Sequence, residues 1–211
     1  MKVAIPALIS ACLGVGICGF GAAYMYNARM NQQIPTSPAL ELSISEFSLI
    51  DQNGELADQS ILDGNYTVAG FIFTNCPGLC PIMTRTMADA QTRLRGLDVQ
   101  FVSFSLDAER DSPEAMVAFA ETHGADLDNW ILLTGDTEET RRIVREDLLL
   151  VVDDETDNQV PTADGGTMAN ILHPTRMLLI GPNRKVLGMY SVMDGSGVDA
   201  LEADLRQILG R

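Results

Sequence analysis

Residues 66–81 read YTVAGFIFTNCPGLCP, and the elements on either side follow from this stretch. Residues 66–73 form a nearly continuous apolar run, which predicts a strand buried on both faces. A short loop with Cys76 and Cys80 in a CxxxC spacing follows the strand. Residues 81–95 then place apolar side chains at helical intervals and end at a glycine, which predicts a helix.

Strands and helices alternate through the rest of the chain. A hairpin is expected around Asp51-Gln52-Asn53-Gly54. After the cysteine loop and its helix we expect strand 99–106, a helix from Pro113 capped by Ser112, strand 130–133, a helix from about 137 to 149, a hairpin of 176–180 and 186–190, and helix 198–209. Residues 153–170 are acidic and are expected to be irregular. This order predicts an α/β, thioredoxin-like fold with a central, mostly parallel sheet flanked by helices.

The composition bounds the class of protein. The chain has 211 residues, which suits one domain plus an N-terminal segment. Apolar residues make up 46 % of it, which argues against wholesale disorder. The formal net charge of -15 would repel phosphate backbones, so we expect no nucleic-acid partner. The same charge serves either solubility or docking to a basic partner.

The N-terminal segment has the composition of a membrane helix. No charged residue lies between Lys2 and Arg29, and an apolar run of about 20 residues is long enough to cross a bilayer. We therefore expect a membrane anchor over residues 1–28, a linker over 29–40 and an exported thioredoxin-like domain over 41–211. The domain would face the periplasm from a bacterial-type inner membrane, or an equivalent intermembrane space. A cleaved signal peptide is the main alternative, and a lipoprotein signal is a weaker one.

The cysteines limit the chemistry. Cys12 and Cys18 fall in the expected anchor, so only Cys76 and Cys80 remain for the exported domain. In an oxidising compartment such a pair forms a disulfide, a redox couple or a metal site. We expect Pro81 to be the first helical residue and Cys80 the N-cap, where the helix dipole lowers a thiol pKa. Two thiolates select soft ions such as Cu(I), or Zn(II).

The chain has two histidines. His123 precedes a glycine at an expected helix end, where a cation complements the helix dipole. His173 precedes the late hairpin, and in a thioredoxin-like topology it would face the cysteine loop as a nitrogen ligand. We also expect the His173–Pro174 bond to be cis, as in the proline that such folds place opposite the cysteines.

Three separated motifs resemble the Sco/SenC family. They are TNCPGLCP at 74–81, SLDAERDSP at 105–113, and the segment that runs from His173 to Pro182. The resemblance covers roughly residues 40–211. Two positions depart from the usual family pattern, because Gly78 stands where an acidic residue is frequent and Pro174 follows the histidine.

The resemblance implies a function and a set of site residues. Cys76, Cys80 and His173 would bind one copper ion, as Cu(I) or Cu(II), and Asp107 would lie near them as a supporting residue. The protein would be a metallochaperone that assists assembly of the binuclear copper site of cytochrome c oxidase. Its partner would be the copper-bearing subunit of that oxidase or another copper protein.

Other functions remain open at this stage. A thiol–disulfide oxidoreductase that reduces a partner's cysteines would need Cys76 and Cys80 but not His173, so whether the chain is an enzyme is undecided. A thiol peroxidase is a further alternative, although Thr74 stands too close to Cys76 for the peroxidase pattern. The last alternative is a binding domain in which Cys76 and Cys80 form a purely structural disulfide.

Overall fold

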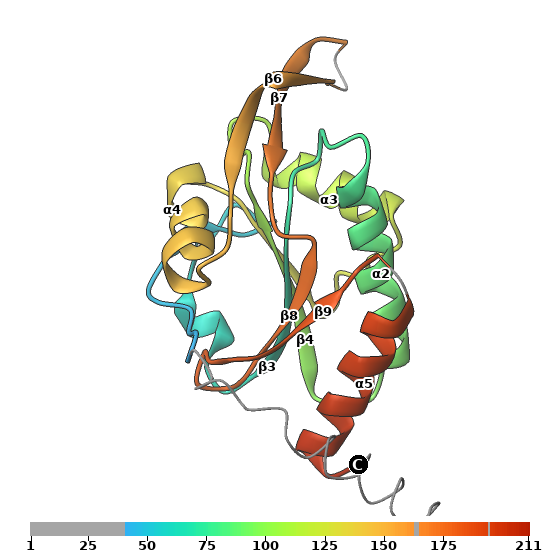
Figure 1. Cartoon of the computed structure of the whole chain (residues 1–211). Coiled ribbons are helices and arrows are strands. Elements are labelled where there is room, and N and C mark those ends of the chain that lie inside the picture. Colours follow the sequence, from blue (N-terminus) through green and yellow to red (C-terminus); the bar gives the residue numbers. More distant parts are fainter. Residues whose placement is uncertain (1–40, 163–164, 194) are drawn as a thin grey trace, which may run out of the picture. The chain divides into compact units, whose positions relative to one another are not determined.

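The computed structural model describes residues 41–162, 165–193 and 195–211 (Figure 1). Residues 41–211 make up one compact unit. The anchor expected over 1–28 and the linker over 29–40 lie outside the described residues, so both stay predictions. Among the helices in the described part of the chain, none is long and apolar enough to cross a membrane.

A five-stranded sheet forms the centre of the domain, in the order β5-β4-β3-β8-β9. Its strands are β3 (Tyr66–Ile72), β4 (Val99–Ser105), β5 (Trp130–Leu133), β8 (Arg176–Ile180) and β9 (Val186–Ser191). β3 pairs in parallel with β4, and β4 with β5, whereas β8 runs antiparallel to both β3 and β9. The α/β class is confirmed, but the sheet is mixed rather than mostly parallel. The short turn between β8 and β9 requires those two strands to be antiparallel.

Helices cover the sheet. They are α2 (Leu79–Arg93), α3 (Pro113–Thr122), α4 (Thr137–Arg142) and α5 (Gly195–Leu209), with a 3-10 turn η1 at Gln59–Leu62 and a π-helical turn η2 at Ile143–Asp147. α2 and α5 lie side by side, and α4 lies on the opposite side of the sheet (Figure 1). Gly70 lets α2 approach β3 closely, because a Cβ there would lie 2.8 Å from side-chain atoms of Met83 and Met87. The run predicted as a doubly buried strand is buried from Thr67 to Phe73.

Two hairpins complete the domain. β1 (Ser48–Ile50) and β2 (Leu56–Asp58) form the one expected at the Asn-Gly turn. β6 (Asp153–Pro161) and β7 (Thr167–Leu172) form a second, which projects from the body of the domain (Figure 1). This region was expected to be irregular, and that expectation was wrong. β6 is mostly exposed and polar, so its strand is held by backbone pairing with β7 and leaves no apolar pattern to detect.

Candidate metal and thiol site

The cysteine loop leaves the end of β3 and enters α2. The helix begins at Leu79 with Gly78 as its N-cap, so Cys80 and Pro81 both lie in its first turn. The predicted start, with Cys80 as N-cap and Pro81 first, was therefore two residues late. Because the first four N–H groups of a helix have no partner within the helix, the missing N–H of Pro81 costs no hydrogen bond there.

The three ligands predicted from the sequence come together at this end of the sheet. Cys80 Sγ lies 3.4 Å from His173 Nε2, and the backbone N–H of Cys80 donates to Cys76 Sγ at 3.4 Å. All three residues are buried, and both cysteines are free thiols. Within the described ranges no three His, Cys, Asp or Glu side chains form a ready-made metal cluster. The arrangement shown is a hydrogen-bonded thiol and imidazole with a second sulfur beside them.

The orientation of the His173 ring is fixed from two sides. Its edge packs against Phe73, with ring centroids 5.7 Å apart and an interplanar angle of 82°. Its Nδ1 lies 3.1 Å from the carbonyl oxygen of Pro174. A carbonyl only accepts, so Nδ1 carries the hydrogen, and in the neutral ring Nε2 presents its lone pair to Cys80.

The expected cis bond at His173–Pro174 was wrong. No cis peptide bond occurs among the residues that the structure describes. The trans form is intrinsically favoured by about 0.5–1 kcal/mol for a bond to proline. His173 is positioned here without the cis isomer.

The two thiols differ in acidity. The hydrogen bond with the Cys80 side chain, helped by His173 and by the backbone N–H groups of Cys80 and Gly78, lowers the pKa of Cys76 to about 4 against the opposing effect of burial. Burial raises the pKa of Cys80 well above its usual range, and the neighbouring Cys76 raises it further. At neutral pH the pair therefore holds one thiolate and one thiol.

Asp111 supports the cysteine loop, and the sequence reasoning missed it. Its side chain is fully buried, and its Oδ1 accepts from the backbone N–H of Thr74 at 3.0 Å and from Thr74 Oγ1 at 2.5 Å. Its Oδ2 accepts from Ser105 Oγ at 2.7 Å. Asp107, the predicted supporting residue, is instead paired with Arg110 at 2.9 Å. Asp111 thus ties the loop after β4 to the start of the cysteine loop, and the only sequence signal for it was a second aspartate in the same motif.

His123 lies apart from the site, as predicted. It caps the end of α3, where its Nδ1 is 2.7 Å from the carbonyl oxygen of Phe119 and its ring packs on the Phe119 ring.

The sequence and the fold resemble those of known proteins. Residues 36–210 match the SCO1/SenC family model. The chain is 31 % identical over 171 residues to the SCO1 protein homolog of Bacillus subtilis (strain 168), covering 79 % of this chain and 83 % of that one. It resembles a structure of BsSco, a Sco-family cytochrome c oxidase assembly protein with a disulfide switch, with a TM-score of 0.67 and 30 % identity over 80 % of this chain and 94 % of that one. Copper-bound ScoI from Arabidopsis thaliana gives a TM-score of 0.60 and 25 % identity, covering 79 % and 98 %.

We expect Cys76 to titrate far below an ordinary thiol. Since its pKa lies at about 4, the ultraviolet absorbance of one thiolate should appear as the pH rises through that value and stay constant through neutrality. In Cys80→Ala the largest stabilising hydrogen bond is lost, so the transition should move to higher pH. A single transition at the ordinary thiol pKa of about 8.5 in the unmodified protein would contradict this assignment.

We expect Asp111→Asn to affect both stability and the thiols. The amide cannot replace both acceptor oxygens, so the free energy of unfolding should fall by about 1–3 kcal/mol in a urea titration. The pKa of Cys80 should also fall, because the Asp111 charge is one of the factors that raise it. Asp107→Asn, the matched change in the same loop, should leave the Cys80 titration unaltered. An unchanged Cys80 pKa in Asp111→Asn would show that the Asp111 charge does not influence the thiols.

Proposed function

Because this chain belongs to the SCO1/SenC family, we propose that it binds one copper ion through Cys76, Cys80 and His173 and assists assembly of cytochrome c oxidase. The observation that carries the proposal is the 3.4 Å approach of Cys80 Sγ to His173 Nε2, between residues 93 positions apart in the chain. Cys76 Sγ lies beside them, within reach of the Cys80 backbone N–H.

The donor set fits copper. Two sulfurs and one imidazole nitrogen are soft or borderline ligands, which suit Cu(I). Cys76 is already a thiolate at neutral pH, and the ring hydrogen on His173 Nδ1 leaves Nε2 free to bind. Cys80 must lose its proton when the metal enters, so copper affinity should rise with pH.

The proposed recipient is the copper-bearing subunit of cytochrome c oxidase, with its binuclear copper site. Support comes from relatives, because BsSco belongs to a family of oxidase assembly proteins and ScoI of Arabidopsis thaliana carries copper. The copper ion is thus cargo, and the protein's contribution is a pair of sulfurs that can hold and release it.

A second candidate function is thiol–disulfide exchange, which the unequal thiols favour. The Cys76 thiolate would attack a partner disulfide, releasing one partner thiolate and forming a mixed disulfide. Cys80, after giving up its proton, would then attack Cys76 Sγ and release the second partner sulfur. Two electrons pass to the partner, and a disulfide between Cys76 and Cys80 remains.

We also propose that residues 1–28 anchor the domain to a bacterial-type inner membrane, with residues 41–211 on the periplasmic side. The apolar stretch between Lys2 and Arg29 supports this, as does the position of the family match, which begins at residue 36.

We expect the reduced chain to bind one Cu(I) and each ligand variant to bind it poorly. Losing one of three ligands should lower the Cu(I) affinity by about a hundredfold or more. This loss exceeds the 10–100-fold that is typical when a residue hydrogen-bonded to a metal ligand is replaced. Cys76→Ala, Cys80→Ala and His173→Ala should all show this loss in competition with a Cu(I) chelator. His123→Ala changes the other histidine and should bind as the unmodified chain does. Tight, stoichiometric binding by His173→Ala would refute the three-ligand site.

The same variants separate the two candidate functions. His173→Ala should keep much of any activity toward a model disulfide, because exchange needs only the sulfurs. Cys76→Ala should abolish it.

We expect the chain to remain attached to membranes. Cell fractionation should place it in the membrane fraction, resistant to salt extraction, and intact-mass measurement should give the full 22.8 kDa. A soluble product shortened at its N-terminus would show instead that the segment is a cleaved signal.

A further inference from the structure

His173 lies at a junction between two parts of the fold. It follows β7 directly, and β8 begins a few residues later in the central sheet. The sheet therefore fixes the side of the junction that leads into β8. The other side is carried by the projecting hairpin of β6 and β7 (Figure 1). The position of the imidazole thus depends on how this hairpin is held against the body of the domain.

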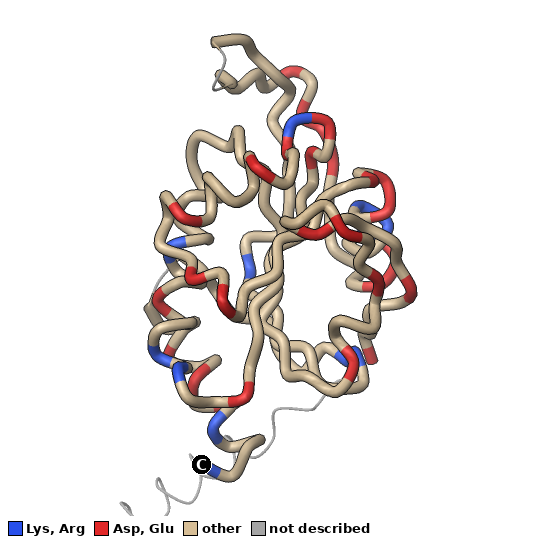
Figure 2. The backbone as a smooth tube through the Cα atoms, turned by 180° about the vertical axis from the view of Figure 1, so that it is seen from behind, with Lys and Arg blue, Asp and Glu red and all other residues tan. Residues whose placement is uncertain are grey.

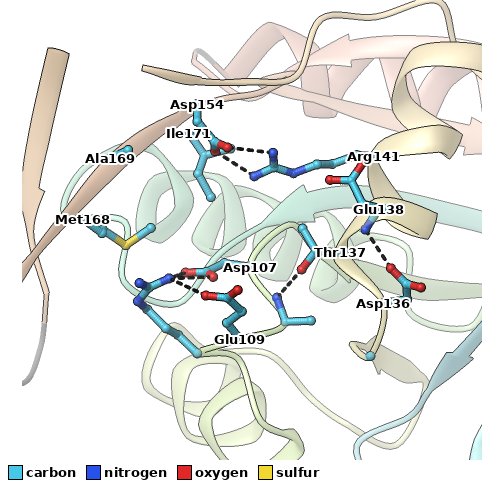
Figure 3. Close-up of a pocket in the computed structure, with 13 residues that line it drawn as sticks. Asp107, Glu109, Asp136, Thr137, Glu138, Arg141, Asp154, Met168, Ala169 and Ile171 are labelled. Atoms are coloured by element: carbon cyan, nitrogen blue, oxygen red, sulfur yellow. Dashed lines mark hydrogen bonds and ion pairs between the residues drawn. The ribbon is translucent and has the colours of Figure 1, made fainter. Parts of the chain in front are cut away.

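Packing holds the base of the hairpin only in part. Met168 and Ile171 of β7 are buried, whereas none of the nine described residues of β6 is. A cavity of about 700 Å³ lies between the hairpin, the loop 107–110 and the start of α4 (Figure 3). Apolar contacts are also non-directional, so they fix the depth of a strand better than its angle.

Arg141 of α4 supplies a directional contact. Its side chain is only 10 % exposed, and its two terminal nitrogens donate to the two carboxylate oxygens of Asp154 at 2.9 and 2.7 Å (Figure 3). A two-pronged pair of this kind fixes the relative orientation of its partners. The sequence from 153 to 172 contains no lysine or arginine, so the cation that pairs with Asp154 comes from the body of the domain (Figure 2).

The strand register carries this constraint to His173. Across the hairpin, Asp154 pairs with Ile171 and Asp153 with Leu172, the residue before His173. Opposed residues of antiparallel strands lie about 4.5–5.5 Å apart, so a shift of Asp154 moves the end of β7 with it. His173 Nε2 lies 3.4 Å from Cys80 Sγ, and a displacement of about 1 Å is enough to lose this contact.

We propose that Arg141 is a positioning residue for His173. Through its ion pair with Asp154 it holds the hairpin at the angle that brings the imidazole onto Cys80, and it acts through the hairpin backbone rather than on the sulfurs. Without the pair, the hairpin samples several angles and His173 faces Cys80 for only part of the time. The role of His173 as a copper ligand rests on the proposed function, whereas its placement in the metal-free chain does not.

The test uses the reduced, metal-free full chain labelled with ¹⁵N-histidine, which gives ring signals from His123 and His173 alone. At about pH 8 an ordinary imidazole is neutral. In the unmodified chain the His173 shifts should show one tautomer, with the hydrogen on Nδ1. In Arg141→Gln they should move towards the average of the two tautomers, because the ring is no longer held on Cys80. The His123 shifts should not change.

The matched control is Arg142→Gln, at the next residue of α4. Arg142 also forms two ion pairs, but its partners Glu139 and Asp147 lie in the body of the domain. Both substitutions should lower the Tm, whereas only Arg141→Gln should move the His173 signals. If Arg141→Gln does not fold, the double variant Arg141→Gln/Asp154→Asn takes its place, because it leaves neither charge of the pair without a partner.

A Cu(I) titration against a chelator then shows whether the effect passes through His173. Arg141→Gln should weaken binding about tenfold, the lower end of the range for residues that support a metal ligand. In the His173→Ala background the same substitution should change the affinity by less than about twofold.

Three results would overturn the proposal: unchanged His173 signals in Arg141→Gln, equal changes in Arg142→Gln, or a tenfold weakening that persists without His173. If His173→Ala binds Cu(I) as tightly as the unmodified chain, the proposed function fails, and the signals of the metal-free chain still decide the role of Arg141.

Discussion

The antiparallel pairing of β8 with β3 is the constraint from which the site follows. Thr67 pairs with Ile180 and Ala69 with Leu178, so the end of β3 lies beside the start of β8. Residues that follow β3 therefore meet residues that precede β8, which brings the cysteine loop and His173 to one point. In a parallel arrangement His173 would lie at the far end of the sheet. The mixed topology is thus a condition of the chemistry as well as a feature of the fold.

Burial at this point gives the two thiols different pKa values. Cys80 lies deeper and is held protonated, while Cys76 gains hydrogen bonds that favour its charge. Asp111 brings a second negative group close without touching either sulfur, because its oxygens are occupied by Thr74 and Ser105. A buried carboxylate with all of its neighbours satisfied is a rigid support. It fixes the start of the cysteine loop through Thr74.

Most of the fold could be predicted, because the central strands are apolar runs and the helices carry caps such as Ser112 before Pro113. The meeting of the cysteines with His173 required a topology, which the thioredoxin-like order of predicted elements supplied. Three features escaped prediction for physical reasons. Helix α2 starts early because its first turn tolerates Pro81, β6 has no buried face, and Asp111 acts through Thr74 rather than through a ligand. Local sequence patterns indicate which residues are buried and where helices are capped. They do not indicate which polar groups, distant in the sequence, form hydrogen bonds with one another.

The projecting hairpin of β6 and β7 concentrates part of the acidic composition next to the site. From Asp153 to Leu172 there is no lysine or arginine, and the acidic residues of the hairpin strands, Asp153, Asp154, Glu155 and Asp157, all lie in β6. Solubility alone would be served by charges placed anywhere. Here the end of β7 leads directly into His173, and the base of the hairpin closes a cavity in which Arg141 is fixed by Asp154. The hairpin that delivers the imidazole to the sulfurs is therefore also one wall of this cavity.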